Sequence, residues 1–268
     1  MISAEASLPT HAPLVLQAEL GGVRTLTLND PGARNALSNP MMGALQQAIE
    51  SAASDTNVRV IVLAAAGPAF CAGHDLKELR ANTDPAFRVV LLERCVRLML
   101  SIVRCPKPVI ARVHGIATAA GCQLVASCDL AVAAEQARFA TPGVNIGLFC
   151  STPMVALSRN LANKHAMEML LTGDLVSASD AYRMGLVNRV VPADRLDAAV
   201  QEFATKLAAK SRSAIAIGKR AFYEQGELPL EQAYRFAAEA MLRNLETADC
   251  AEGIGAFVDK RVACWVDP

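Results

Sequence analysis

The sequence predicts an α/β fold with a C-terminal helical region, and two patterns along its 268 residues indicate this. Short, almost wholly apolar runs, typical of strands buried on both faces, alternate with amphipathic helical patterns through the first two-thirds of the chain. Beyond residue 192 only helical patterns remain. We therefore expect a loose tail at 1–13, an α/β core at 14–192 and a helical assembly region at 193–268.

The first elements are a hairpin and a helix. Leu14–Leu20 and Val23–Leu28 flank two glycines, which predicts a β-hairpin. Ser38 or Asn39 can cap the helix that follows, with Pro40 at its first position. Its apolar residues recur on one face, as expected for a helix packed on a core: Met41, Met42, Leu45, Ala48, Ile49 and Ala52.

The middle of the chain interleaves strands and helices. Three apolar runs predict buried strands: Arg59–Ala65, Val109–His114 and Asp129–Ala134. A helix from Pro85 to about Arg104 separates the first two, and one ending at Cys128 separates the last two. Loops of small residues follow the first two strands, at Ala66–Gly73 and Gly115–Gly121.

The remaining segments are mainly helical. A helix starts at Ser151, and a capped helix runs from Ser177 to Gly185. The other expected elements are a helix at Lys164–Leu171, a strand at Leu186–Val191, and helices at Ala193–Ala209, Ala214–Gln225, Pro229–Asn244 and Thr247–Val258.

Composition excludes several classes of protein. Hydrophobic residues make up 53% and charged residues 19%, which excludes intrinsic disorder. Lys and Arg number 26 and balance 26 Asp and Glu, so a nucleic-acid-binding surface is not expected. No apolar run reaches the roughly 20 residues of a membrane helix, so we expect no membrane partner.

Eight cysteines indicate free thiols. None forms a C-x-x-C motif or has zinc-ligand spacing with the four histidines, so no metal site is expected. Most lie among apolar residues, where free cysteine behaves as a small hydrophobe. The segment Met1–Pro13 lacks the features of a signal or transit peptide. These observations together predict a reducing, cytoplasmic location.

Two strand-to-helix loops are candidates for chemistry, Phe70–Leu76 and Thr118–Gln123. Small residues let a ligand approach the backbone, and a helix start presents unpaired N–H groups. Two such groups aimed at one point form an oxyanion hole. From spacing alone, ordinary structural loops remain the alternative.

Four segments together resemble the enoyl-CoA hydratase/isomerase (crotonase) superfamily, in that family's order and spacing. They are Arg34–Leu37, Phe70–Leu79, Gly115–Leu130 and Phe139–Leu148. Within the superfamily, Gly73–Leu79, Ala117–Gln123 and Gly147–Pro153 resemble the subgroup of enoyl-CoA hydratase domain-containing protein 3. The resemblance covers about Leu14–Val262.

The resemblance implies a spiral of ββα units, a C-terminal region that builds trimers or dimers of trimers and covers the pocket, and an acyl-CoA substrate with no further cofactor. It implies that the backbone N–H groups of His74 and Ala120 are the oxyanion donors. It places Arg34 near the CoA phosphates. The other implied substrate contacts are Ala36, Ala72, Gly73, Asp75, Leu76, Gly121, Pro142 and Cys150.

Two positions depart from the family pattern. Hydratases of the family use two glutamates, and this chain has Gln123 and Gly143 there. Hydration needs a base for water and an acid for the α-carbon, and neither residue can transfer a proton. The expected activity is that of a hydratase-like lyase with weak ordinary hydration. A malonyl-type acyl-CoA decarboxylase and a non-catalytic acyl-CoA-binding protein remain alternatives.

Overall fold

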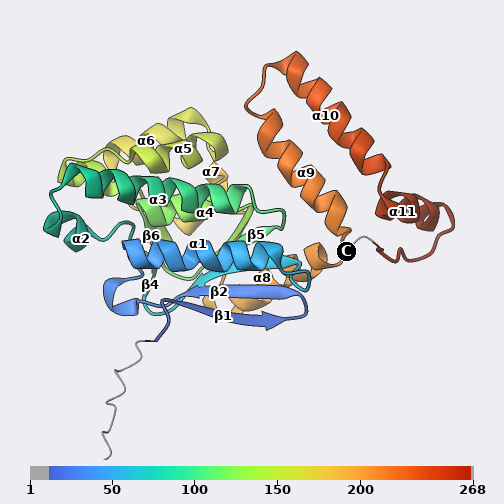
Figure 1. Cartoon of the computed structure of the whole chain (residues 1–268). Helices are drawn as coiled ribbons and strands as arrows, with labels where there is room; N and C mark the ends of the chain where they lie inside the picture. Colours follow the sequence, from blue (N-terminus) through green and yellow to red (C-terminus); the bar gives the residue numbers. More distant parts are fainter. Residues whose placement is uncertain (1–11, 267–268) are drawn as a thin grey trace, which may run out of the picture.

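The structure, a computed structural model, describes residues 12–266 and contains two sheets (Figure 1). The larger sheet has the strand order β1-β2-β3-β5-β7-β10 and the smaller one β4-β6-β8-β9. The larger sheet comprises β1 Val15–Leu20, β2 Val23–Leu28, β3 Val60–Ala65, β5 Val109–Val113, β7 Leu130–Ala134 and β10 Arg189–Val191. The smaller comprises β4 Ala69–Cys71, β6 Ile116–Thr118, β8 Arg138–Ala140 and β9 Val176–Ser177. Residues 1–11 of the expected tail lie outside the described range.

The central strands of the larger sheet, β3, β5 and β7, are buried on both faces, which explains their near-continuous apolar sequences. Apart from the β1–β2 hairpin, its neighbouring strands are parallel. Ile61 and Leu63 of β3 pack in one core cluster with helices α1 (Asn39–Ser54) and α3 (Pro85–Val103). Val60 and Val62 pack on the other face against α8 (Leu196–Ala208).

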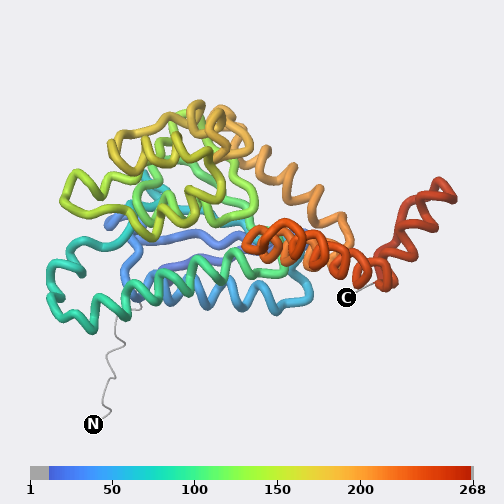
Figure 2. The backbone as a smooth tube through the Cα atoms, turned by 90° about the horizontal axis from the view of Figure 1, so that it is seen from above, coloured from blue at the N-terminus to red at the C-terminus, as the bar shows by residue number. Residues whose placement is uncertain are grey.

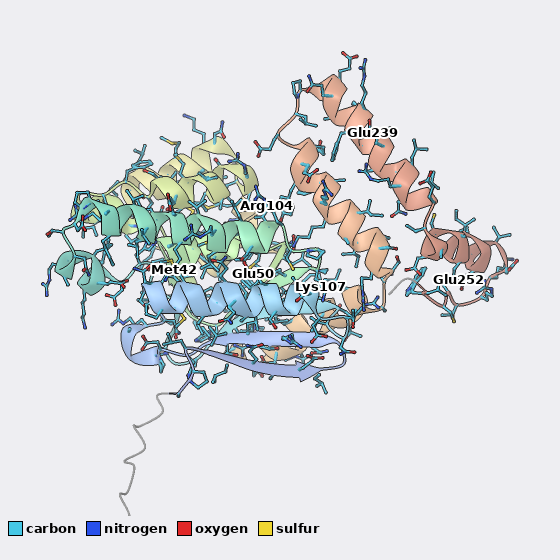
Figure 3. The ribbon with its side chains drawn as sticks, viewed as in Figure 1. Met42, Glu50, Arg104, Lys107, Glu239 and Glu252 are labelled. Atoms are coloured by element: carbon cyan, nitrogen blue, oxygen red, sulfur yellow. The ribbon has the colours of Figure 1, made fainter. Side chains whose placement is uncertain are left out.

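Helix α1 forms as its sequence predicts. The Ser38 hydroxyl accepts a hydrogen bond from the Met41 N–H (3.3 Å), and all six expected apolar residues are buried. At the other end, the buried Lys107 ammonium donates to the Ala52 carbonyl (2.6 Å) and to the Asp55 carbonyl (Figure 3). A cation at the C-terminus of a helix satisfies carbonyls that have no partner within it.

The smaller sheet corrects the sequence analysis, which placed Ala66–Gly73 and Gly115–Gly121 in loops. Three-residue strands, β4 and β6, lie inside these segments, and such strands are too short to show a periodic pattern. The two strands are parallel to each other, and β8 lies parallel to β6. Each follows a strand of the larger sheet in the chain, and a helix comes after it, which gives the expected succession of ββα units.

Several helices complete the core. Helix α2 (Leu76–Ala81) begins at the end of the strand-to-helix loop predicted at Phe70–Leu76, and α4 (Ala120–Ser127) follows β6. The others are α5 Ser151–Asn160, α6 Asn163–Thr172 and α7 Ala178–Met184, with 3₁₀ turns η1 Pro31–Ala33, η2 Pro142–Ile146 and η3 Ala193–Arg195. Among the described residues, no helix combines the length and apolar character that crossing a bilayer requires.

The helical region expected at 193–268 divides in two. Helix α8 belongs to the core, whereas α9 (Arg212–Gln225), α10 (Leu230–Leu245) and α11 (Ala248–Val258) project from it as an arm (Figures 1 and 2). Large apolar side chains of the arm are exposed, among them Phe222, Leu230, Tyr234, Met241, Leu245, Ile254 and Phe257.

A polar cluster fixes the arm to the core. The Lys219 ammonium of α9 donates to the Asp129 carboxylate (2.7 Å) and to the carbonyls of Ile102 (3.1 Å) and Lys107 (3.0 Å). The Tyr223 hydroxyl donates to the other carboxylate oxygen of Asp129 (2.9 Å). Burial and the Asp129 charge raise the pKa of Tyr223, so the phenol remains a donor. We call Asp129, Lys219 and Tyr223 the clasp.

Candidate functional site

The smaller sheet brings together most of the residues singled out from the sequence. Strands β4, β6 and β8 are parallel neighbours, so the segments that follow them lie at one edge of the sheet. Ten of the expected site residues belong to these segments: Ala72, Gly73, His74, Asp75, Leu76, Ala120, Gly121, Gln123, Pro142 and Gly143. The loop of Arg34 and Ala36 joins them, because the Ala72 N–H donates to the Arg34 carbonyl (3.1 Å).

Two glycines allow the segments to touch. Gly73 has φ +89°, and a Cβ built on it would lie 2.8 Å from the Ala119 Cβ and 3.2 Å from the Ala120 nitrogen. A Cβ on Gly121 would lie 2.2 Å from the Cys71 carbonyl oxygen. Real Cβ atoms are not found so close to other atoms, so both positions require glycine for this close approach.

The start of helix α4 has an unusual backbone. Ala119 has φ 50° and ψ −120°, a conformation that costs free energy for a residue with a Cβ, and its N–H donates to the Ala140 carbonyl (2.9 Å). Ala120 is the first residue of α4, where helical N–H groups lack a partner within the helix. Within residues 12–266 we find no hydrogen-bond acceptor for the His74 N–H either. Two backbone donors therefore remain available on touching segments.

The His74 imidazole is largely buried in this region. Its Nε2 is covered and has no hydrogen-bond partner among the described residues. Burial lowers the pKa of His74, and the nearby Glu78 carboxylate partly opposes the shift. Since the ordinary value is 6.5, the imidazole is neutral near pH 7.

Gln123 lies one helical turn after Ala120 and is only 5% exposed. Its Oε1 is covered and accepts no hydrogen bond from the part of the chain that the structure describes. An unsatisfied buried polar atom is uncommon in proteins and calls for an explanation.

Gly143 is closed in by the loop after it. A Cβ at this position would lie 2.5 Å from the Leu148 carbonyl oxygen and 2.9 Å from the Cys150 Sγ. A glutamate therefore cannot occupy position 143 unless this loop moves. Burial raises the pKa of the Cys150 thiol, although the Gly143 N–H opposes the shift. The thiol is therefore protonated near neutral pH, which does not suit a nucleophile.

The remaining expected residues divide between structural and surface positions. Asp75 caps α2, since its carboxylate accepts from the N–H groups of Lys77 (2.8 Å) and Glu78 (3.2 Å). Arg34 and Leu76 are exposed.

Sequence analysis gave no role to Asn35, which is fully buried. Its amide donates to the carbonyls of Ala66 (2.8 Å) and Ala69 (2.9 Å) and so ties the Arg34 loop to β4. Its place within Arg34–Leu37, a segment of the family resemblance, is the signal that could have identified it.

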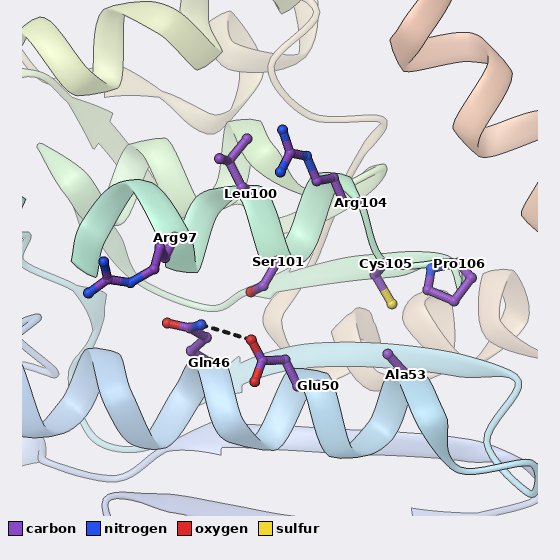
Figure 4. Close-up of a pocket in the computed structure, with 9 residues that line it drawn as sticks. All are labelled: Gln46, Glu50, Ala53, Arg97, Leu100, Ser101, Arg104, Cys105 and Pro106. Atoms are coloured by element: carbon purple, nitrogen blue, oxygen red, sulfur yellow. Dashed lines mark hydrogen bonds between the residues drawn. The ribbon is translucent and has the colours of Figure 1, made fainter. Parts of the chain in front are cut away.

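A hollow of about 360 Å³ lies elsewhere, between α1 and α3 (Figure 4). Gln46 and Glu50, joined by a 2.8 Å hydrogen bond, line one side of it, and Arg97 and Arg104 line the other. None of the expected site residues contributes to it. Among residues 12–266, no group of three or more His, Cys, Asp and Glu is arranged to hold a metal ion.

Comparison with known proteins gives consistent results. A sequence profile of the enoyl-CoA hydratase/isomerase family matches residues 19–268. Mitochondrial enoyl-CoA hydratase domain-containing protein 3 of Xenopus laevis is 48% identical over 255 residues, which cover 95% of this chain and 87% of the relative.

Solved structures agree with this. An enoyl-CoA hydratase of Mycobacterium smegmatis has a TM-score of 0.92 and 55% identity, with 95% of this chain and 99% of that chain covered. Human enoyl-CoA hydratase domain-containing protein 3 has a TM-score of 0.91 and 45% identity, with 94% and 100% covered.

The same comparison shows that the predicted cytoplasmic location is wrong. Relatives from frog, rat, mouse, human and zebrafish, 45–48% identical, are all named as mitochondrial proteins, which points to mitochondria instead. Free cysteines indicate a reducing compartment and do not by themselves distinguish the cytoplasm from another one.

Proposed function

Since the chain belongs to the enoyl-CoA hydratase/isomerase (crotonase) superfamily and to its subgroup of enoyl-CoA hydratase domain-containing protein 3, we propose that it binds acyl-CoA thioesters and stabilises their enolates. One observation carries the proposal: the contact of Gly73 with Ala119 and Ala120 brings two unpaired backbone N–H groups onto touching segments. These are the N–H groups of His74 and Ala120.

In this proposal the two N–H groups donate to the thioester carbonyl oxygen. Negative charge grows on that oxygen as the enolate forms, and fixed donors in a dry site stabilise it without reorganising. The positive end of α4 adds to the effect at Ala120. Removal of one such donor costs about 10²–10³-fold in rate in enzymes that use this device.

We assign the CoA part of the substrate to the outer side of the site. Arg34 is exposed, so its guanidinium is free to bind phosphate oxygens. Leu76 presents apolar surface beside the segment of Ala72, where the pantetheine arm would lie. Both residues adjoin the loop that Asn35 fixes to β4, so the CoA contacts and the oxyanion donors share one support.

Ordinary enoyl-CoA hydration is expected to be slow. The Gln123 amide does not exchange a proton near neutral pH, and Gly143 offers no side chain and no room for one. Reactions that need enolate stabilisation without a carboxylate base suit the site better. We therefore describe the activity as that of a hydratase-like lyase, with malonyl-type decarboxylation and binding without turnover as the alternatives.

Binding and turnover with defined thioesters test the proposal. Acetyl-CoA should raise the melting temperature of the protein and acetate should not, and equal effects would refute CoA recognition. Crotonyl-CoA and methylmalonyl-CoA should then be offered as substrates. Hydration of crotonyl-CoA with kcat/KM of roughly 10⁶ M⁻¹s⁻¹ or more would contradict slow hydration. Turnover of methylmalonyl-CoA alone would select the decarboxylase.

We further propose that the arm assembles the chain into trimers or dimers of trimers. The exposed apolar residues of α9–α11 support this, because a monomer would leave them in water. Light scattering at micromolar concentration should give three or six times the chain mass. A monomer mass would refute the proposal.

A further inference from the structure

Thr118, the last residue of β6, joins the two segments that carry the proposed donors. The backbone ladder between β4 and β6 ends where Cys71 pairs with Ala117. One residue further on, the Thr118 hydroxyl donates a hydrogen bond to the Ala72 carbonyl (3.1 Å). A side chain therefore makes the next link between the two segments, at the point where their backbone pairing stops.

The Ala72 carbonyl matters because only Gly73 separates its peptide from the one that carries the His74 N–H. A glycine lets both peptide planes rotate, and Gly73 has φ +89°, in the left-handed region. The Gly73 carbonyl accepts from the Leu37 N–H (2.7 Å). The C=O and N–H of a planar trans peptide point in opposite directions, so this bond turns the His74 N–H away from Leu37. The Thr118 hydroxyl holds the other plane.

The second proposed donor, the Ala120 N–H, is held by a helix. The Ala119 carbonyl, in the same peptide, accepts from the Gln123 N–H (3.0 Å) within α4 and so fixes the direction of this donor. The strained backbone of Ala119 is held in turn by the bond from its N–H to the Ala140 carbonyl (2.9 Å). One donor thus lies on a helix and the other on a glycine loop. The Thr118 hydroxyl connects that loop to the strand that leads into the helix.

We infer that Thr118 is a positioning residue that keeps the His74 and Ala120 N–H groups directed at one thioester oxygen. The inference rests on the proposed acyl-CoA function. Fixed donors stabilise a growing negative charge only while they keep their direction, because a hydrogen bond weakens steeply as its angle departs from linear. Without the hydroxyl, the peptide between Ala72 and Gly73 loses its hydrogen bond to β6, and only packing then limits its rotation.

Calorimetric titration with two ligands that differ only at the carbonyl tests this inference. They are butyryl-CoA and its thioether S-butyl-CoA, which has the same chain and no carbonyl oxygen. The parent should bind the thioester about tenfold or more tightly, as expected for two additional hydrogen bonds. Thr118→Val keeps the branched shape and removes the hydroxyl. It should lower this preference to about threefold or less and leave S-butyl-CoA binding within about threefold of the parent.

The carbonyl stretching frequency of bound butyryl-CoA, isotope-labelled at the thioester carbon, gives a second measurement. Hydrogen bonds to the oxygen polarise the carbonyl and lower this frequency. The downward shift on binding should be about half as large in Thr118→Val as in the parent, because one donor is no longer directed at the oxygen. Thr118→Ser keeps the hydroxyl and should restore the shift. A purely structural role for Thr118 would lower the melting temperature and leave the shift unchanged.

Thr247→Val, in the arm, is the matched control. The Thr247 hydroxyl also donates to a backbone carbonyl, that of Asn244 (2.8 Å), and it caps α11. This variant should melt below the parent and keep both the preference for the thioester and the carbonyl frequency, which separates a loss of stability from a loss of position. If Thr118→Val does not fold, Thr118→Ala, which also lacks the hydroxyl, replaces it in every comparison.

The outcomes separate the inference from the proposed function. Failure of both ligands to bind the parent, or equal affinity of the parent for the two, would refute the proposed function and this inference with it. A preference that Thr118→Val retains in full would overturn only the inference. A loss that Thr118→Ser does not restore would also overturn it, because the methyl group rather than the hydroxyl would then set the geometry.

Discussion

The two sheets of this protein are held together in different ways. Most strands of the larger sheet have five or six residues and are covered by apolar side chains on both faces. The parallel strands of the smaller sheet have three residues, and contacts between the segments that follow them, at Gly73 and Gly121, add to their short ladders. The larger sheet therefore supplies most of the buried apolar surface, whereas the smaller one depends on backbone fit. The candidate site lies on the smaller sheet.

The strongest test of this contrast is Gly121→Ala. The new Cβ would lie 2.2 Å from the Cys71 carbonyl oxygen, a backbone atom that cannot rotate away. Helix α4 must then move away from β4, and we expect a loss of about 3 kcal/mol or more in the free energy of unfolding. Acyl-CoA binding should be lost as well. Urea denaturation and a thioester titration measure both effects.

Gly43→Ala is the matched control within α1, against the larger sheet. The nearest atom to its new Cβ is the Arg94 Nη1 at 3.8 Å, so the methyl group fits. Alanine in a helix interior should stabilise the protein by about 0.5–1 kcal/mol. A loss of stability in Gly43→Ala as large as that in Gly121→Ala would contradict the contrast between the sheets.

A second test concerns the clasp, which joins the arm to Asp129, the residue before β7 of the larger sheet. Lys219→Met leaves Asp129 with two donors, the Val109 N–H and the Tyr223 hydroxyl. We expect a loss of about 2–3 kcal/mol, below the usual range for breaking a buried ion pair because these donors remain. The dissociation constant of the proposed oligomer should rise, so that dilution separates the subunits at a higher protein concentration than in the parent. Tyr223→Phe should cost only about 1 kcal/mol.

A third test separates the two positions where the family has glutamates. Gly143→Glu forces a side chain against the Leu148 carbonyl, so it should lower stability by about 2 kcal/mol without any gain in hydration. Gln123→Glu needs no new space and should raise crotonyl-CoA hydration by up to about 10²-fold. A folded Gly143→Glu protein with increased hydration would show that the loop after η2 moves easily.

The smallest expected effect is a pH dependence from His74. Its folded-state pKa lies below the ordinary 6.5, because burial disfavours the charged form. The unfolded chain therefore binds more protons below pH 6.5, and the free energy of unfolding should fall as the pH falls through that value. His74→Gln should flatten the profile, and the control His165→Gln, at a half-exposed side chain on α6, should not. An unchanged slope in His74→Gln would contradict the assignment.

Long elements of the fold could be predicted from the sequence because their patterns repeat within the element. The hairpin, α1 with its six buried residues, and the end of α7 at Gly185 are confirmed nearly to the residue. The smaller sheet could not be predicted, since Ala69 pairs with Ile116 and Ile116 with Arg138. Pairing over such separations leaves no local signal in three residues.

The site was predictable in its residues and not in its geometry. Resemblance identified the segments around Gly73, Ala120 and Gly143, and the structure places them at one edge of a sheet. A side chain is excluded at Gly143 because the following loop returns and places the Leu148 carbonyl oxygen against this position. The lack of a partner for the Gln123 Oε1 depends on the positions of the groups packed around it. Both are properties of three-dimensional packing, which a local sequence pattern does not reveal.

The distant pairing of β4, β6 and β8 also determines when the site can form during folding. Joining Ala69 to Ile116 and then to Arg138 closes two long stretches of chain, and the entropy of closure must be lost before the contacts are gained. The β1–β2 hairpin and α1 need only local contacts. A refolding chain should therefore protect its hairpin amides from hydrogen exchange before it acquires affinity for thioesters.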